Sequence, residues 1–330
     1  MLPRLLFIGL ALCCAVVMHA GDAVPAGDAA QVGDAAPTWK TKHVVILVID
    51  GPRWTETWGK PGRDLIPVRD KILAPQGVWL SDMANDGPTY TNAGHSALTT
   101  GFYQEINNSG QELPRNPSIT QRMIAAGSNP QHVWVVTSKD KLQILTDSAA
   151  PEWNHRHVCS SDCGKDGAGS GYREDRVTFE RVKAVISEHH PRFLLINFKE
   201  PDASGHAKKW DEYLANIQTT DQYAGQVWEH IQADPQMKDV TTLFITNDHG
   251  RHLDGHKDAY ISHGDDCAGC RKIELVAIGP DFKRGATSNV HRSQIEVAVT
   301  AAALLGLTHP GSEGKVMTEL FSEPAAKIVK

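Results

Sequence analysis

The sequence predicts an α/β fold in which a doubly wound, mostly parallel sheet carries helices on both faces. Residues 44–49 read Val-Val-Ile-Leu-Val-Ile, a largely β-branched run without a polar interruption. Such a run is typical of a strand that is buried on both faces of a parallel sheet. Similar runs alternate along the chain with stretches of helical periodicity, which is the order that crossover connections require. The further expected strands are His132–Thr137, Phe193–Phe198, Thr242–Thr246 and Ile273–Ile278, and the expected helices are Ser118–Ala126, Arg176–Glu188, Tyr213–Ile231 and Ser293–Leu305.

The N-terminus has the features of a secretory signal peptide. Arg4 precedes an apolar run over residues 5–17, and small residues follow that run. The run is shorter than the roughly 20 residues of a membrane-spanning helix, and no later segment comes closer. We therefore expect residues 1–20 to be removed, with cleavage as late as residue 26, and the protein to be periplasmic or secreted without stable membrane insertion. A lipoprotein anchored through Cys13 or Cys14 is the alternative.

The remaining chain divides into a short linker and one domain. Residues 21–40 contain a repeated Gly-Asp-Ala pattern with little to bury, so a disordered linker is expected. Residues 41–330 show no further break in composition, which predicts a single catalytic domain. The formal net charge is −6 and no basic stripe occurs, which argues against a nucleic acid partner.

The four cysteines that remain after export form two closely spaced pairs, Cys159 with Cys163 and Cys267 with Cys270. An oxidising compartment favours disulfides, and four cysteines leave three pairings open. The C-x3-C and C-x2-C spacings would also suit a four-thiolate zinc site, which is the alternative.

Acidic residues and histidines follow the ends of several expected strands. Asp50 ends the first run, Asp202 follows the run 193–198, and Asp248-His249 follows the run 242–246. In doubly wound sheets ligands bind beyond the carboxyl ends of the strands. Carboxylates gathered there repel one another unless a cation neutralises them, so the pattern predicts a metal centre. The spacing of Asp202 and His206 puts both side chains on one side of a helical turn, as a metal-binding pair requires.

Five ordered motifs resemble those of the alkaline phosphatase superfamily. They are Asp50-Gly51, the Thr-rich segment 88–101, Asp202-x3-His206, Asp248-His249-Gly250 and His263-Gly264. They are most similar to the branch that contains nucleotide pyrophosphatase/phosphodiesterases, Thr-type alkaline phosphatases and phosphonoacetate hydrolase. The resemblance spans about residues 42–306, and the chain lacks the long cap insertion that the phosphodiesterase relatives usually carry between these motifs.

The resemblance implies two divalent metal ions, expected to be zinc, with manganese or iron in one site as the alternative. One ion would be held by Asp202, His206 and His263, and the other by Asp50, Thr91, Asp248 and His249. His252 and His256 lie in the same loop as His263, so His256 remains an alternative third ligand.

The family pattern selects Thr91 as the nucleophile. It would begin a helix, whose N-terminus favours an incoming anion, and a metal bound to its oxygen would favour the alkoxide. A phosphothreonine intermediate would form and then be hydrolysed by water. His95 lies one turn further along and is expected to be structural.

Two further groups bear on the substrate. Lys139 and Lys141 resemble the lysine pair by which Thr-type monoesterases and phosphonoacetate hydrolase hold a terminal dianion, and on an extended segment both would face the same side. A solvated charge run is the alternative. Asn107 and Asn108 lie where relatives place an asparagine that donates to a phosphoryl oxygen, and the sequence does not distinguish between them.

The sequence thus predicts an exported two-metal hydrolase of phosphate monoesters or phosphonates, with phosphodiester or nucleotide pyrophosphate hydrolysis as the alternative. A phosphotransferase would use the same intermediate. A sulfatase is disfavoured because no Cys-x-Pro-x-Arg or Ser-x-Pro-x-Arg segment occurs. A non-catalytic metal-binding protein is disfavoured because every ligand position is present.

Overall fold

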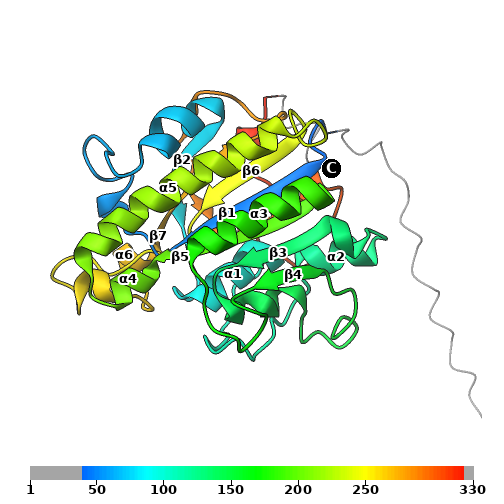
Figure 1. Cartoon of the computed structure of the whole chain (residues 1–330), viewed down its shortest axis with the longest axis horizontal. Coiled ribbons are helices and arrows are strands. Elements are labelled where there is room, and N and C mark those ends of the chain that lie inside the picture. The colour runs from blue at the N-terminus through cyan, green and yellow to red at the C-terminus, as the bar shows by residue number, and fades with distance from the viewer. Residues whose placement is uncertain (1–38, 323–330) are drawn as a thin grey trace, which may run out of the picture. The chain divides into compact units, whose positions relative to one another are not determined.

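The computed structural model describes residues 39–322, which form a nine-stranded sheet with helices packed against it (Figure 1). The strand order is β4-β3-β5-β1-β6-β7-β2-β8, and β9 pairs with β2. The strands are β1 (His43–Asp50), β2 (Val78–Ala84), β3 (Val133–Thr137), β4 (Ser160–Cys163), β5 (Phe193–Pro201), β6 (Thr241–Thr246), β7 (Lys272–Ile278), β8 (Ala286–Ser288) and β9 (Arg292–Ser293). The expected signal peptide and nearly all of the expected linker lie outside the described residues.

The helices cover both faces of the sheet, as predicted. They are α1 (Thr91–Thr100), α2 (Ile119–Ala125), α3 (Asp175–His189), α4 (Asp202–His206), α5 (Trp210–Ala233), α6 (Ala268–Arg271) and α7 (Ile295–Leu304). Helices α3 and α5 pack side by side across one face (Figure 1). Between residues 39 and 322 no helix has both the length and the apolar character that a membrane crossing requires.

Strand β1 explains why the fold has two cores. Its side chains alternate in direction, so Val44, Ile46 and Val48 join the cluster that α1, α2 and α7 complete. The intervening residues Val45, Leu47 and Ile49 join the cluster that α3 and α5 complete. All six side chains are fully buried. The uninterrupted apolar run was therefore a correct signal of a central strand, and the α/β doubly wound fold is confirmed.

The arrangement of the parallel strands creates the site. Strand β1 pairs in parallel with β5 on one side and β6 on the other, and β3 pairs in parallel with β5. The carboxyl ends of these four strands consequently meet at one edge of the sheet. The polar residues that follow them are brought together there, although they are far apart in sequence.

Two features of the sheet differ from the expected mostly parallel sheet of five strands. Strand β7 runs antiparallel to both of its neighbours, β6 and β2. Strand β2 was not expected, because Ser81 and Asp82 interrupt its apolar pattern. The register of its pairing with β7 shifts between Leu80 and Met83, so that the polar pair falls in the irregularity.

The segment that follows β3 forms a helix, whereas the lysine pair Lys139 and Lys141 was expected to lie on an extended segment. Residues Asp140–Thr146 form a 3-10 helix, with Lys139 immediately before it. Leu142 and Leu145 are spaced three residues apart and are both fully buried in the core. A 3-10 turn directs residues with that spacing to the same side. The prediction that Lys139 and Lys141 lie on an extended segment was therefore wrong.

All four cysteines of the described residues are free thiols, so the structure does not contain the predicted disulfides. Cys159 and Cys163 are buried in the apolar core, and burial raises the pKa of each thiol to about 12. Cys163 donates a weak hydrogen bond from its Sγ to the carbonyl oxygen of Val135 at 3.7 Å. Cys159 and Cys163 are therefore protonated thiols that pack in the core.

Candidate active site

Three carboxylates and one ammonium group meet at the strand ends. Asp50 ends β1, Asp202 begins α4 directly after β5, Asp248 follows β6, and Lys139 follows β3. All four side chains are buried. Burial and the neighbouring Asp248 raise the pKa of Asp50 well above its usual range. Charge neutralisation is therefore the central physical requirement of this site.

Lys139 meets part of that requirement. Its Nζ lies 2.9 Å from Asp50 Oδ2, 2.7 Å from Asp202 Oδ2 and 3.1 Å from Thr91 Oγ1. Burial alone would lower the pKa of Lys139, but the carboxylates of Asp202 and Asp50 raise it above its ordinary value. The lysine is therefore a permanent cation within hydrogen-bond reach of the proposed nucleophile.

Three acceptor atoms beside this lysine have no hydrogen-bond partner among the described residues. They are Asp50 Oδ1, Asp248 Oδ2 and His249 Nε2, and all three are buried. His249 Nε2 lies 3.6 Å from Asp50 Oδ1 and 3.4 Å from Asp248 Oδ2. His249 Nδ1 lies 2.9 Å from the Gly250 carbonyl oxygen, which assigns the proton to Nδ1 and leaves a lone pair on Nε2. Two carboxylate oxygens and an imidazole nitrogen that converge in this way fit a divalent cation.

A second group of potential ligands lies beside the first. Asp202 Oδ1 lies 3.2 Å from His206 Nε2 and 3.3 Å from His263 Nε2, and the two imidazole nitrogens are 3.0 Å apart. Their ligand atoms all lie within 4.8 Å of one another. The side chain of His206 is 47% exposed and that of His263 is 6% exposed, so this group faces the solvent side of the centre. Asp202 belongs to both groups, because it also clusters with Asp50 and His249.

The structure separates the three histidines of the loop after β6. His263 lies in the centre, where its Nδ1 is 2.7 Å from the Thr89 carbonyl oxygen. His252 and His256 instead contact Asp265, at 3.3 Å and 2.9 Å. His263, and not His256, therefore lies beside Asp202 and His206, and its role as a metal ligand stays a prediction.

Thr91 is the first residue of α1 and is buried. Close approach of the helix to β6 positions it, because a Cβ on Gly94 would lie 2.5 Å from the carbonyl oxygen of Asp248. A side chain at position 94 would force α1, and Thr91 with it, away from the strand ends.

Some residues contribute more than the sequence indicated. His95 Nδ1 lies 2.9 Å from the Thr91 carbonyl oxygen and 3.3 Å from Asp248 Oδ2. Asn197 donates to Asp50 Oδ2 at 3.1 Å, and its amide nitrogen also lies 3.1 Å from His95 Nε2. Arg251 is fully buried and contacts Asp202 Oδ1. Arg251 directly follows the Asp248-His249-Gly250 motif, which was the one available signal for it.

The two asparagines and Lys141 have distinct positions. Lys141 Nζ donates to Asn108 Oδ1 at 2.8 Å, and that oxygen also accepts from the backbone nitrogen of Asn92 at 3.1 Å. Asn107 Oδ1 instead accepts from the backbone nitrogen of Ser109 at 3.0 Å. Asn108 is thus the asparagine that faces the start of α1. Burial, followed by the charge of Lys139, lowers the pKa of Lys141 to about 8.

Sequence comparison with known proteins identifies the family of this chain. Residues 44–252, well over half of the chain, match the family described as type I phosphodiesterase / nucleotide pyrophosphatase. Ectonucleotide pyrophosphatase/phosphodiesterase family member 1 of Mus musculus is 27% identical over 230 residues, which cover 62% of this chain and 24% of that protein. GPI ethanolamine phosphate transferase 1 of Mus musculus is 23% identical over 304 residues, which cover 82% of this chain and 32% of that protein. The matched part of this chain therefore corresponds to about a quarter to a third of the length of these two relatives.

Solved structures show the same fold. Murine ectonucleotide pyrophosphatase / phosphodiesterase 5 superposes with a TM-score of 0.63 at 14% identity, covering 85% of this chain and 100% of that chain. A protein in the alkaline phosphatase superfamily from Vibrio parahaemolyticus superposes with a TM-score of 0.63 at 15% identity, covering 86% of this chain and 71% of that chain. This chain belongs to the type I phosphodiesterase / nucleotide pyrophosphatase family, whose members are phosphoric ester hydrolases of the alkaline phosphatase superfamily.

Proposed function

We propose that this protein hydrolyses phosphodiesters through a covalent intermediate on Thr91, at a centre that binds two divalent cations. The observation that carries the proposal is the Thr91 hydroxyl, which lies 3.1 Å from the Lys139 ammonium group and in the same cluster as three buried acceptor atoms without partners among the described residues. A nucleophile, a fixed cation and unsatisfied metal ligands in one place are the parts that phosphoryl transfer requires.

The ligands fall into two sets in this proposal. Asp202, His206 and His263 would hold one cation, and Asp50, Thr91, Asp248 and His249 would hold the other. Zinc suits both sets, because imidazole nitrogens and carboxylate oxygens are its common ligands besides thiolates. When bound, the cations supply positive charge that stabilises the transferring phosphoryl group and the alkoxide.

The side chains supply the remaining steps. The Thr91 hydroxyl releases its proton to solvent, and Lys139 stabilises the resulting alkoxide by donating to Oγ1. Thr91 Oγ1 then forms a bond to phosphorus while the bond from phosphorus to the leaving oxygen breaks, and that oxygen takes up a proton from solvent. A water molecule attacks the phosphothreonine in the second step. The bond between phosphorus and Thr91 Oγ1 breaks, and the proton that the attacking water loses restores the Thr91 hydroxyl. Asn108 and Lys141, at the start of α1, would donate to the phosphoryl oxygens.

Diesters replace the monoesters and phosphonates that the sequence favoured, for two reasons. Lys139 already contacts both Asp50 and Asp202, so it is not free to bind the second charge of a terminal dianion. A diester must also find room for a second substituent. A cavity of about 360 Å³ is lined by Thr89, Tyr90 and Gly264, which adjoin Thr91 and His263 in the sequence, and the proposal places the second substituent there.

The family description and one solved structure support the same choice. The family to which the chain belongs is described by its phosphodiesterase and nucleotide pyrophosphatase activities. A structure of murine ectonucleotide pyrophosphatase / phosphodiesterase 5 describes an inactive threonine-to-alanine variant in complex with AMP. For this chain a nucleotide substrate and a threonine nucleophile are parts of the proposal.

Hydrolysis of monoesters or phosphonates is the second candidate, and one observation favours it. Lys141 is mostly buried, and the only hydrogen bond that its ammonium group makes among the described residues goes to Asn108. A cation in that position could hold the extra charge of a monoester.

The deciding experiment compares kcat/KM of the zinc-loaded protein for bis-p-nitrophenyl phosphate and p-nitrophenyl phosphate. The proposal requires the diester to be the better substrate. Faster turnover of the monoester, with a selective loss of that activity in Lys141→Ala, would establish the second candidate instead. The same assays with added alcohol test for transfer, because a phosphotransferase would form the alkyl phosphate as its main product.

We also propose that the protein is exported, on the basis of the charged and apolar residues 1–17. N-terminal sequencing of protein from the periplasm and the medium tests this. A start within residues 21–27 is expected, and full-length protein confined to the cytoplasm would contradict it.

A further inference from the structure

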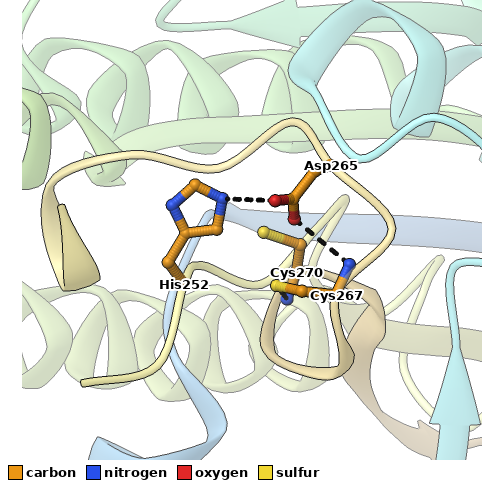
Figure 2. Close-up of side chains that lie close together, drawn as sticks. All are labelled: His252, Asp265, Cys267 and Cys270. Carbon is orange, nitrogen blue, oxygen red and sulfur yellow. Dashed lines mark hydrogen bonds and ion pairs between the residues drawn. The ribbon is translucent and has the colours of Figure 1, made fainter. Parts of the chain in front are cut away.

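A second group of metal-ligating side chains lies outside the active site, in the loop between β6 and β7. His252, Asp265, Cys267 and Cys270 each offer one ligand atom, and these four atoms all lie within 4.8 Å of one another. Figure 2 shows the four side chains turned toward a common centre. The group shares no residue with the Asp and His clusters of the active site.

The environment of His252 matches that of a metal-ligating imidazole. The residue is 1% exposed, and its Nδ1 lies 3.2 Å from both Asp258 Oδ1 and Ser262 Oγ. A carboxylate that accepts from Nδ1 leaves the lone pair on Nε2, which is the arrangement found behind most histidine metal ligands. His252 Nε2 is buried and has no hydrogen-bond partner among the described residues. It faces Asp265 Oδ2 at 3.3 Å, so two acceptors oppose each other across the centre of the group.

The two cysteines are positioned as a metal-binding pair, and burial raises the pKa of the Cys270 thiol to about 12, so this thiol keeps its proton until a metal ion displaces it. Both are free, and the two-residue spacing of Cys267 and Cys270 is the spacing of cysteine pairs in zinc sites. The backbone nitrogen of Cys270 lies 3.4 Å from Cys267 Sγ and donates to it, which favours negative charge on that sulfur. The backbone nitrogen of Cys267 donates to Asp265 Oδ1 at 3.1 Å, which holds the carboxylate beside the pair.

We propose that His252, Asp265, Cys267 and Cys270 bind one structural divalent ion of the zinc class, separate from the active site. Two sulfur ligands, one imidazole nitrogen and one carboxylate oxygen select zinc over magnesium or calcium. Binding exchanges the ion for the two thiol protons, which pass to solvent, and no oxidant is required. Four protein ligands leave no open position, so the ion is structural. Asp265 is the weakest ligand, because Lys257 and His256 share its Oδ2 at 2.7 Å and 2.9 Å.

The location of this site gives it a consequence for the active site. Its four ligands bracket His263 in sequence, and Thr89 donates from Oγ1 to the Asp265 carbonyl oxygen at 2.6 Å. The Thr89 carbonyl oxygen in turn contacts His263 Nδ1. An ion that ties His252 to the cysteine pair would therefore hold the loop that presents His263.

Cobalt spectroscopy on the reduced full-length protein tests the proposal directly. The active site provides only oxygen and nitrogen donors, so a thiolate-to-cobalt charge-transfer band in the near ultraviolet reports on this site alone. Wild type should develop the band and bind one equivalent of cobalt through sulfur. The double variant Cys267→Ser/Cys270→Ser should lose the band and one molar equivalent of zinc by elemental analysis. The band should persist in Cys13→Ala/Cys14→Ala/Cys159→Ala/Cys163→Ala, which removes the other four thiols of the full-length chain, and in His206→Ala, which disrupts the active-site cluster.

Asp258→Asn keeps the proposal testable if the cysteine variant does not fold. The Asp258 side chain is 46% exposed, so its replacement should be tolerated by the fold. Loss of this partner of His252 should weaken zinc binding at the site by about 10- to 100-fold in a chelator competition. Absence of the band in reduced wild type would overturn the proposal, as would equal zinc content in wild type and the cysteine variant. A Cys267–Cys270 disulfide in the protein as purified would also overturn it. None of these results depends on catalytic activity.

Discussion

Lys139 Nζ lies 2.7 Å from Asp202 Oδ2, and this buried ion pair connects the two candidate metal clusters. The same ammonium group lies 2.9 Å from Asp50 Oδ2, so it shares carboxylates with both proposed cations. A fixed cation in that position reduces the repulsion among the carboxylates, and it also competes with divalent ions for their oxygens. These two effects can be separated by experiment.

Lys139→Ala should lower kcat/KM while it strengthens zinc binding. The loss of one charge-assisted contact to the Thr91 oxygen is worth about 1.5 to 3 kcal/mol, which corresponds to roughly ten- to a hundredfold in rate. Chelator competition should show tighter zinc binding, because Asp50 and Asp202 lose their competing cation. Lys199→Ala is the matched control, since it removes a buried lysine of β5 that contacts Glu200 instead. Weaker zinc binding in Lys139→Ala would contradict the competition argument.

Thr91→Ala should lose at least roughly a thousandfold in turnover while it keeps its fold, because the variant lacks the nucleophile and retains the other ligands. Thr91→Ser should retain measurable activity, since it keeps the hydroxyl. Thr100→Ala is the control, because Thr100 is a buried threonine of the same helix whose hydroxyl donates to the Ser96 carbonyl oxygen at 2.7 Å. A phosphorylated peptide containing residue 91, trapped by acid quench, would identify the intermediate. If Thr91→Ala retained several per cent of the wild-type rate, the nucleophile would have to be another residue.

Asn108→Ala should lower kcat/KM about tenfold, whereas Asn107→Ala should leave it nearly unchanged. One hydrogen bond to a charged group is worth roughly 1.5 to 3 kcal/mol, and Asn108 is the asparagine that contacts Lys141 and the start of α1. Asn107 is its adjacent control, because its side chain turns to Ser109. Equal losses in the two variants, measured on the same diester, would show that the loop as a whole matters and that Asn108 has no special role.

Removal of divalent metal should abolish activity and lower the thermal stability. A cation that binds the folded state at a hundred times its Kd adds about 2.7 kcal/mol, so its removal should lower Tm by several degrees. The contribution of the active site can be isolated with Asp50→Asn. This variant neutralises one buried carboxylate, so chelation should lower its Tm by less than it lowers that of wild type. An equal decrease in both proteins would indicate that the stabilising metal is bound elsewhere.

His309 should make the stability of the protein depend on pH. Burial lowers the pKa of His309 from 6.5 to about 4, and neither ring nitrogen has a hydrogen-bond partner among residues 39–322. Between these pH values the unfolded chain binds more protons than the folded one, so stability is present above pH 6.5 and is lost as the pH falls toward 4. The loss is at most about 3 kcal/mol. His309→Leu should flatten the pH dependence of the free energy of unfolding, and His291→Leu, at a histidine whose side chain is 60% exposed, should not.

Much of the fold could be predicted because its signals are local. The apolar run of β1, the helical periodicity of α3 and α5, and the order of the Asp and His motifs all lie within short stretches of sequence, where burial pattern and spacing determine the outcome. The same holds for Asp202 with His206, which are neighbours on one turn. These local features identified the family, the edge of the sheet where the site lies, and the residues that gather there.

Tertiary structure alone decided the remaining questions, because their answers depend on contacts between residues that are distant in the chain. Strand order brings Lys139 to Asp50, 89 residues earlier, and so turns an expected substrate clamp into part of the centre itself. Backbone turns that composition does not specify direct Asn108 toward Lys141 and Asn107 away from it. The loop between β6 and β7 brings His252 beside the cysteine pair, and no motif in the sequence had joined these residues, whereas His263 had been expected at the active site from the His263-Gly264 motif. The direction in which a loop residue points is set by the surfaces that surround the loop, and these exist only after the sheet has assembled.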